Sequence, residues 1–389
     1  MTTPYPFQIE DTDRITQLGG RVLIASEVGT GKSLIALLYA ISNPNARPII
    51  IVCPASIKWV WEDQAKRHVG MRAEVLEGPR PESNGGFHHK RQLIVVNYDI
   101  LHAWLPWLRS LKPQIVILDE AHYLMSRTSR RTKASRLLCK GVPHILAMTG
   151  TPITNRPADV WPTLNILRPK LFQSFWTFAS EFCNLKRTPW GWDFSGASNL
   201  DILHRTLIDK LMIRRRKVDI LDQLPEKQRI VLPIDMDAKG RTEYIKAEDD
   251  FLGWIGETQP SKLRGASRAE AIVKFGHLKR LAGRRKIPAV MEWIDNFLVS
   301  EEKLIVFAIH KKVIRRLAKR YWATCVKVDG SVTGKQRKLA IQKFLTHRDC
   351  RLLIGNVKAA GVGWSAKGIS NIAFIEFPWT PGDVTQAEG

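Results

Sequence analysis

The sequence has few cysteines, no long hydrophobic run and no leader-like N-terminus. Its five cysteines are an odd number, lie far apart and form no C-x-x-C pair, so they indicate buried free thiols, and neither a disulfide framework nor a zinc site. Apolar runs such as Ile49–Val52 have the length of a strand, far below the roughly 20 apolar residues of a membrane span. Residues 1–11 have neither a basic n-region nor an apolar h-region, which argues against secretion. These absences predict a cytoplasmic protein, associated with the nucleoid in a bacterium or phage.

Acidic residues are scarce relative to basic ones. The chain of 389 residues has 37 Asp and Glu against 60 Lys and Arg, a formal net charge of +23. Such a chain repels itself and attracts polyanions, so nucleic acid is the leading partner, with a generically basic soluble protein as the alternative. The charge comes in clusters, of which several can line a groove: Arg127–Arg136, Arg214–Lys217, Lys279–Lys286 and Lys311–Arg320.

Strand-length apolar runs alternate with amphipathic stretches in both halves of the chain, which predicts an α/β fold with parallel sheets flanked by helices. Between Ala158 and about Leu281 the strand signal nearly vanishes, and a helical region is expected there. The segment Leu221–Lys227 is the candidate boundary, giving domains 1–222 and 223–389. The strands expected are Val22–Ala25, Ile49–Cys53, Leu93–Val96, Ile115–Leu118 and Ile145–Met148, then Leu304–Ala308, Cys325–Val328, Leu352–Gly355 and Ile372–Ile375.

The most informative segment is a strand that runs into a glycine-rich loop, a Lys-Ser pair and an amphipathic helix. This is the context of a phosphate-binding loop, although a glycine-rich turn without a ligand is the alternative. Glycines let backbone N–H groups face phosphates, the lysine neutralises their charge, and the serine hydroxyl can ligate Mg²⁺. The strict pattern fails at Ser26, so the loop fits a variant seen in helicase-like ATPases. The predicted ATP-binding residues here are Gly29, Thr30, Gly31, Lys32 and Ser33.

A second motif follows the buried run Ile115–Leu118, with the sequence Asp-Glu-Ala-His. Asp119 is expected to hold Mg²⁺, and Glu120 to orient or deprotonate the attacking water. An acidic cap after a strand is the alternative. Because both motifs occur in this order, ATP hydrolysis with ATP and Mg²⁺ is the hypothesis at the level of residues, with Lys32, Asp119 and Glu120 as catalytic candidates.

With these motifs in place the chain resembles a superfamily 2 helicase-like ATPase (DEAH box), more narrowly the Swi/Snf-type double-stranded DNA translocases. Further short motifs match in family order. Gln8 resembles the glutamine that reads adenine, and the resemblance implies DNA contacts from two later segments, although Ser56 is equally readable as a helix N-cap. These segments are Pro54–Trp61, with Ser56 and Lys58, and Val96–Tyr98, with Asn97 and Tyr98. The basic clusters add Arg214 and Lys311 as DNA-binding candidates, with solvated helix faces as the alternative.

The resemblance also implies residues that couple the nucleotide to DNA. Thr149-Gly150-Thr151-Pro152 is similar to motif III, and residues 359–363 and 379–388 are similar to motif V and the approach to motif VI. The fold implied is two RecA-like lobes with a helical middle. The coupling residues are His122, Thr149, Gly150, Thr151, Gly361, Gly363 and Gln386.

A run of Lys-Arg-Thr-Pro-Trp-Gly-Trp-Asp-Phe at residues 186–194 resembles the HepA-related, annealing-helicase branch. Packing of this run against the first lobe is favoured over contact with DNA. The family continues into motif VI, whose arginines reach the γ-phosphate, whereas this sequence stops at Gly389. We therefore expect a chain truncated before motif VI, in which hydrolysis is in doubt.

The function expected is ATP-dependent translocation on double-stranded or forked DNA, in fork rewinding and repair or in remodelling of protein–DNA complexes. Other replication or repair proteins are further expected partners, and no membrane is. A hydrolysis-deficient module that binds DNA and ATP is the alternative.

Overall fold

The computed structural model describes residues 3–78, 92–150, 156–189, 191–220, 229–234, 238–249, 270–332, 334–357, 369–378, 384 and 387–388. The chain forms two compact units, Met1–Leu224 and Pro225–Glu388. The predicted linker, 221–227, lies outside the described residues, so the boundary after residue 222 stays a prediction. No helix of the described part is long and apolar enough to cross a bilayer. All five cysteines are free thiols.

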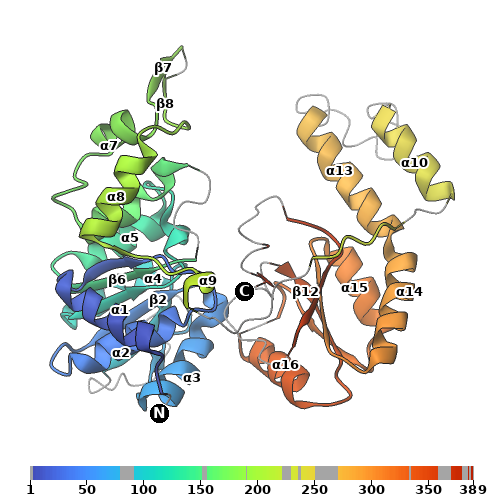
Figure 1. Ribbon diagram of the computed structural model, residues 1–389, viewed down its shortest axis with the longest axis horizontal. Helices are drawn as coiled ribbons and strands as arrows, with labels where there is room; N and C mark the ends of the chain where they lie inside the picture. Colours follow the sequence, from blue (N-terminus) through green and yellow to red (C-terminus); the bar gives the residue numbers. More distant parts are fainter. Residues whose placement is uncertain are drawn as a thin grey trace. The chain divides into compact units, whose positions relative to one another are not determined.

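The first unit is built on a parallel sheet in which, among the described residues, seven strands have the order β3-β4-β2-β5-β6-β1-β9 (Figure 1). The central strands are buried runs rich in branched residues, as expected of strands covered on both faces. The strands are β1 (Arg21–Ile24), β2 (Ile49–Cys53), β3 (Glu74–Val75), β4 (Leu93–Asn97), β5 (Ile115–Leu118), β6 (His144–Met148) and β9 (Met212–Ile213).

Helices connect these strands and cover the sheet. Several begin at a defined cap: Ser129 accepts a hydrogen bond from the Thr132 amide, and Ser174 accepts one from the Thr177 amide. The α-helices are α1 (Pro6–Gln17), α2 (Lys32–Ser42), α3 (Lys58–Val69), α4 (Leu101–Ser110), α5 (Arg130–Cys139), α6 (Trp161–Leu167), α7 (Phe175–Phe182), α8 (Leu200–Lys210) and α9 (Lys217–Ile220). Short 3₁₀ turns are η1 (Ala55–Ile57), η3 (Ala121–Leu124) and η4 (Pro157–Asp159).

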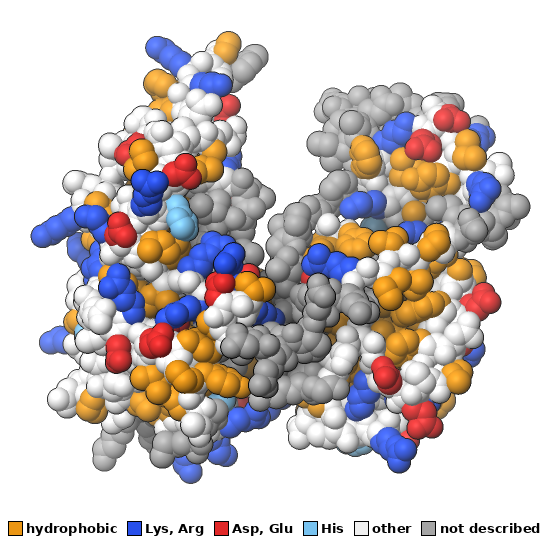
Figure 2. Space-filling view, viewed as in Figure 1, with side chains coloured by type: hydrophobic (Ala, Val, Ile, Leu, Met, Phe, Trp, Pro, Cys, Tyr) orange, Lys and Arg blue, Asp and Glu red, His pale blue; other side chains and the backbone are white. Residues whose placement is uncertain are grey.

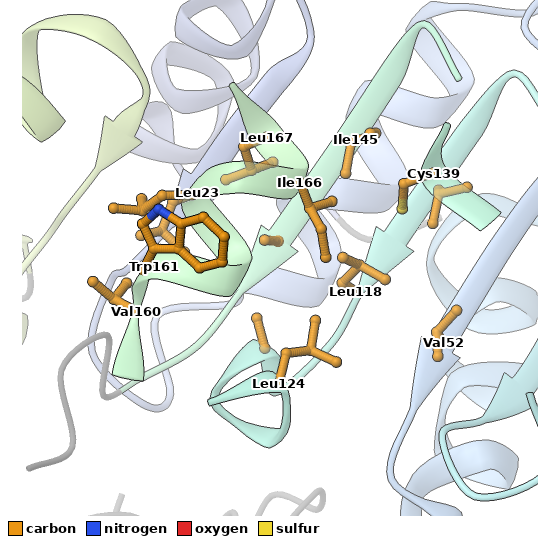
Figure 3. Close-up of a cluster of buried hydrophobic side chains, with 14 of the residues drawn as sticks. Leu23, Val52, Leu118, Leu124, Cys139, Ile145, Val160, Trp161, Ile166 and Leu167 are labelled. Atoms are coloured by element: carbon orange, nitrogen blue, oxygen red, sulfur yellow. The ribbon is translucent and has the colours of Figure 1, made fainter. Parts of the chain in front are cut away.

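One face of the sheet packs against α4 to α8 in a single apolar cluster. Figure 3 shows Trp161, Ile166 and Leu167 of α6 among side chains from several strands of the sheet. On the other side of the fold, α1 packs on α2 and α2 on α3. The carboxyl ends of the strands are therefore held by buried side chains, which fixes the loops that follow them.

A two-stranded antiparallel hairpin, β7 (Lys186–Thr188) and β8 (Gly191–Asp193), projects from the end of the unit that carries α7 and α8 (Figure 1). Its strand residues are exposed except for half-buried Thr188. Among the described residues, the expected packing of this run against the lobe is seen at Phe194, which packs on the apolar cluster, and at Trp192, whose ring lies beside that of Trp176 of α7.

The second unit has its own parallel sheet, with the order β11-β12-β10-β13 among its described residues. Its strands are β10 (Leu304–Ala308), β11 (Cys325–Val328), β12 (Leu352–Asn356) and β13 (Asn371–Phe374). The helices are α10 (Ala238–Asp249), α13 (Glu270–Arg285), α14 (Ile287–Phe297), α15 (Lys311–Arg320) and α16 (Gly334–Thr346), with a 3₁₀ turn, η6 (Leu298–Ser300). Two parallel sheets flanked by helices, with mainly helical segments between β6 and β10, confirm the predicted fold class.

Candidate functional site

A glycine-rich loop joins the end of β1 to α2. Gly29 and Gly31 have positive φ angles of 86° and 81°, which glycine adopts at little cost. Gly31 also permits a close approach, because a Cβ there would collide with the side-chain amide of Gln8. Since α2 begins at Lys32, the unpaired N–H groups of its first turn and the positive end of its dipole face the loop. This geometry suits an anionic group.

The Lys32 side chain points back along this loop. Its Nζ donates to the backbone carbonyls of Ser26 at 2.9 Å and Glu27 at 3.0 Å. Burial lowers the pKa of the Lys32 ammonium, while the carboxylates of Glu120 and Asp119 raise it. A desolvated ammonium whose hydrogen bonds go to neutral carbonyls is well placed to exchange these carbonyls for phosphate oxygens.

Gln8 of α1 is attached to the same loop. The side chain is 4% exposed. Its Oε1 accepts from the Tyr5 amide at 2.9 Å, and its Nε2 donates to the Thr30 carbonyl at 3.2 Å. Thr30 is itself buried and donates through Oγ1 to the Glu27 carbonyl at 2.9 Å. The residue predicted to read adenine therefore lies beside the loop predicted to bind phosphates.

Asp119 follows β5 and is buried. Its Oδ2 accepts from the indole Nε1 of Trp61 at 2.7 Å, and its Oδ1 accepts from the Glu120 amide at 2.9 Å. Burial, and after it the charge of Glu120, raise the pKa of Asp119 to about 7, against the opposing effects of Trp61 and Lys32. A buried carboxylate beside a second carboxylate is relieved by a nearby cation.

Trp61 is a site residue that sequence reasoning misses. It lies on α3 and is 1% exposed. The sequence assigns the segment that contains it only to DNA contacts, and no spacing rule connects it with Asp119, which is 58 residues away. The contact depends on α3 packing close to the end of β5.

His122 links the acidic motif to the neighbouring strand end. Its Nδ1 lies 3.2 Å from Oε2 of Glu120 and 3.3 Å from Oγ1 of Thr149. Thr149 is 2% exposed and follows β6, which lies between β5 and β1 in the sheet. The histidine therefore touches both the predicted base and the predicted coupling motif.

Gly150 continues this connection to the phosphate loop. A Cβ on Gly150 would collide with the Val28 side chain, and would lie 3.8 Å from Nζ of Lys32. The strand ends of β1, β6 and β5 thus bring Lys32, Gly150, His122 and Glu120 into one continuous site. Thr151, the next residue of the predicted coupling motif, lies outside the described residues.

The residues present fit a magnesium nucleotide. Ser33 and Asp119 offer the hydroxyl and carboxylate oxygens that Mg²⁺ prefers, and they flank the lysine that suits the phosphates. No group of three or more His, Cys, Asp or Glu in the described part of the chain could hold a metal ion. Phosphate oxygens and water would therefore have to supply the remaining ligands, as is usual for Mg²⁺.

The basic segment that follows β9 is attached to the phosphate loop, a role that the sequence does not indicate. The Ser26 hydroxyl accepts from the Arg215 amide at 3.1 Å, and the Glu27 carboxylate accepts from the Lys217 amide at 3.0 Å. The Arg215 guanidinium donates to Asp11 of α1 at 2.9 Å. Part of the predicted DNA-binding cluster therefore holds the loop in place, and only Arg214 and Arg216 are exposed.

Three of the predicted DNA contacts of the first unit have buried side chains. Lys58 is buried, and its Nζ donates to the Leu76 carbonyl at 2.7 Å. Tyr98 is buried and donates its hydroxyl to the Asp119 carbonyl at 2.9 Å, and Asn97 is 5% exposed. These three side chains are buried in the unit, and those of Lys58 and Tyr98 donate to its backbone carbonyls, so a role as surface contacts is unsupported. Ser56 is half-buried in η1, and the N-cap of α3 is Ile57, so Ser56 is not the N-cap residue of that helix.

In the second unit, Lys311 begins α15 and is exposed. It belongs to a basic face of that helix with Lys312, Arg315, Arg316 and Lys319, all exposed. This face remains available for a phosphate backbone. Gly361, Gly363 and Gln386, the predicted coupling residues of this unit, lie outside the described residues.

Comparison with known protein families identifies the family of this chain. The "SNF2-related domain" family matches residues 14–280, and the "Helicase conserved C-terminal domain" family matches residues 286–389. This chain belongs to the SNF2-related family. The SNF2-related chain also has the fold of a solved structure, a Sulfolobus solfataricus SWI2/SNF2 ATPase core in complex with dsDNA, with a TM-score of 0.51 and 18% sequence identity. The match covers 96% of this chain and 87% of the Sulfolobus chain.

Two curated relatives are similar along almost the whole chain. A "SWI/SNF-related matrix-associated actin-dependent regulator of chromatin subfamily A-like protein 1" from Xenopus tropicalis is 30% identical over 98% of this chain and 40% of its own length. A "DNA annealing helicase and endonuclease ZRANB3" from Mus musculus is 29% identical over 98% of this chain and 36% of its own length. The SNF2-related chain thus spans well under half the length of these two proteins. The predicted resemblance to Swi/Snf-type ATPases of the annealing-helicase branch is confirmed.

Proposed function

We propose that this SNF2-related chain is an ATP-driven translocase on double-stranded DNA, acting in fork rewinding and repair or in remodelling of protein–DNA complexes. The observation that carries the proposal is the convergence of Lys32, Asp119, Glu120 and His122 at one edge of one sheet. The choice of DNA is supported by the name of the ZRANB3 relative, a DNA annealing helicase, and by the dsDNA in complex with the solved Sulfolobus core.

ATP bound with Mg²⁺ supplies the phosphoryl group whose transfer to water drives the motor. In this proposal Lys32 and the N–H groups around Gly29, Thr30 and Gly31 bind the β- and γ-phosphates. Ser33 and Asp119 would hold Mg²⁺. Gln8, already held against the loop through the Thr30 carbonyl, contacts the adenine.

Glu120 is the proposed general base, since its carboxylate lies beside the phosphate loop and can accept a proton from the attacking water. His122 contacts both Glu120 and Thr149. A change at the γ-phosphate that moves Glu120 would therefore reach the strand end that carries Thr149 and Gly150. We assign the coupling of the nucleotide state to DNA contacts to this path, and to Thr151, Gly361, Gly363 and Gln386.

DNA binding in this proposal uses phosphates rather than base edges. The exposed cations Arg214 and Lys311, with the basic face of α15, are the proposed contacts. Because such contacts release counterions, the affinity for DNA should fall steeply with salt and depend little on sequence. The proposed nucleic-acid partner is duplex or forked DNA, and other replication or repair proteins are proposed as further partners. The proposed location is the cytoplasm or the nucleoid.

The direct test is ATP turnover by the chain with no nucleic acid, single-stranded DNA, blunt duplex or a forked junction. Turnover that rises several-fold with duplex or fork is the expected result. A rate that is the same in all four conditions, at a salt concentration where duplex binding is measured separately, would contradict the proposal.

A further inference from the structure

The projecting hairpin of the first unit carries an exposed aromatic surface flanked by cations. Trp176 of α7 is 45% exposed, and Trp192 of β8 is 52% exposed. Their ring centroids lie 6.3 Å apart, with an interplanar angle of 56°. We call this pair, with Arg127 and Arg187, the indole surface. Figure 2 shows hydrophobic and basic side chains together on this projection.

Both cations lie next to an indole ring. Arg187 is the direct cross-strand partner of Trp192, so the two side chains leave the same face of the hairpin. The Arg127 guanidinium lies 5.3 Å from the Trp176 ring centroid. Asp193 is the nearest acidic residue of the hairpin, and it pairs with Lys186 on the opposite face. The face that carries the indoles therefore combines aromatic rings with positive charge.

The surface has a rigid base. Phe194, directly after β8, packs edge-to-face on Phe175 of α7 at 5.2 Å between centroids. Arg127 covers the same Phe175 ring at 4.1 Å. The strands are further closed by the Thr188 hydroxyl, which donates to the Gly191 carbonyl at 2.7 Å. The two indoles are thus held out from the unit on a packed support, at little entropic cost when a ligand binds.

We propose that the indole surface binds single-stranded DNA, with unpaired bases stacking on Trp176 and Trp192 and the adjacent phosphates paired with Arg127 and Arg187. Aromatic rings interleaved with cations are the usual means of binding single strands, because every base has a π face. A duplex leaves only its terminal base pairs open to stacking, so the surface discriminates unpaired segments from the duplex. The proposal rests on the proposed function only in taking DNA as the polymer.

The test measures binding of a labelled oligothymidine of roughly 12 nucleotides to the full chain without ATP, by fluorescence anisotropy. Replacing both indoles, Trp176→Ala with Trp192→Ala, is expected to weaken binding about ten-fold or more, since stacking on one aromatic side chain is worth that much. The matched control is Trp322→Ala, which removes a tryptophan that is 79% exposed in the other unit and should leave the affinity unchanged. Equal affinity of the double variant and the unaltered chain would overturn the proposal.

A single-site series separates stacking from folding and from general apolar contact. Trp192→Phe keeps an aromatic ring and should retain most of the affinity, whereas Trp192→Leu should lose it. Arg187→Gln should reduce the slope of log affinity against log salt by roughly 0.7, the value for one phosphate contact on a single strand. Equal binding by the Phe and Leu variants would overturn the stacking assignment and point to a protein partner for the surface.

Failure of this proposal and failure of the proposed function are distinguishable. The oligothymidine measurement uses no ATP, so it is independent of turnover. Blunt-duplex stimulation of ATP turnover, measured on the same preparation, tests the motor alone. A chain that hydrolyses ATP with duplex but binds oligothymidine equally with and without the two indoles keeps the proposed function and loses the indole surface.

Discussion

The carboxyl edges of the two sheets use their acidic residues in opposite ways. In the first unit, burial and the neighbouring Glu120 raise the pKa of Asp119 to about 7. In the second, burial also opposes the charge of Asp329, but hydrogen bonds from Ser331 and Lys327 outweigh it and lower the pKa of Asp329. One carboxylate is left in need of a cation, and the other is already neutralised by its own chain.

Glu376 of the second unit is also bound by groups of its own chain. Its Oε2 accepts from the amides of Ile309 at 2.8 Å and His310 at 2.9 Å, and its other oxygen faces the His310 ring. The carboxylate therefore closes the turn between β10 and α15. In the described residues, the first sheet edge leaves the buried carboxylate of Asp119 close to Glu120 and Lys32, whereas the second holds a loop and presents a basic helix.

The largest expected effect is on Glu120. Glu120→Gln keeps the size and the contact with His122 but removes the acceptor for a proton. We expect ATP turnover to fall about 1,000-fold, within the range for loss of a general base, while ATP binding is retained. Turnover and nucleotide binding are measured on the same variant. Unchanged turnover would remove Glu120 from the base role, and the exposed Glu301→Gln of the second unit serves as the control.

Lys32→Ala should have the next largest effect. The loop would lose the cation that now lies on the Ser26 and Glu27 carbonyls, and the phosphates would lose their only lysine in the described loop. We expect nucleotide affinity to fall about 100-fold, equivalent to about 2.7 kcal/mol. The comparison is with Lys311→Ala, which should weaken DNA binding and leave nucleotide affinity as it is. Equal nucleotide affinities for both variants would erase the distinction between the two sheet edges.

The parts of the fold and of the site that the sequence predicts are those whose residues lie close together along the chain. The buried strands are readable because apolar runs such as Ile115–Leu118 are local patterns, and the phosphate loop because its residues are contiguous. The edge strands β3 and β9 have two residues each and no periodicity, so the sequence does not reveal them.

Long-range contacts account for the features of the site that the sequence does not show. The sequence places Lys58 on the surface, but its flexible stem carries the ammonium to the Leu76 carbonyl, which only the fold brings near. Arg215 belongs to a basic cluster in the sequence, yet it pairs with Asp11 at the other end of the unit's sequence. Charge and residue type predict that a site exists, but they do not say whether a given charge is already paired.

The third prediction addresses the second unit. Glu376→Ala should leave two amides without their acceptor and destabilise the turn before α15 by about 2 kcal/mol, the usual value for hydrogen bonds to a charged group. Native-state hydrogen exchange of the Ile309 and His310 amides measures this locally. Glu302→Ala, an exposed residue of the same unit, should change these rates little. Equal rates in both variants would mean that the Glu376 carboxylate does not hold this turn.

The smallest expected effect tests whether Asp119 is prepared for its cation by Trp61. Trp61→Phe removes the indole N–H that donates to Oδ2 at 2.7 Å and keeps an aromatic ring in the core. Without this donor the negative charge of the buried Asp119 carboxylate is less stabilised, and the carboxylate loses a partner that orients it. We expect the Mg²⁺ concentration that half-saturates ADP binding to rise about ten-fold, the lower end for loss of a partner that orients a metal ligand.

Trp104→Phe is the matched control for this variant, because Trp104 is also fully buried and its Nε1 donates at 2.9 Å, but to the Gly78 carbonyl. Both variants lose one buried indole hydrogen bond, so they should lose similar stability. Only Trp61→Phe should change the Mg²⁺ requirement, and ADP affinity without Mg²⁺ should be the same in both. If the two variants need the same Mg²⁺ concentration, Trp61 stabilises the core and does not prepare the carboxylate, and the contrast between Asp119 and Asp329 then rests on the charge of Glu120 beside the first and the hydrogen bonds to the second.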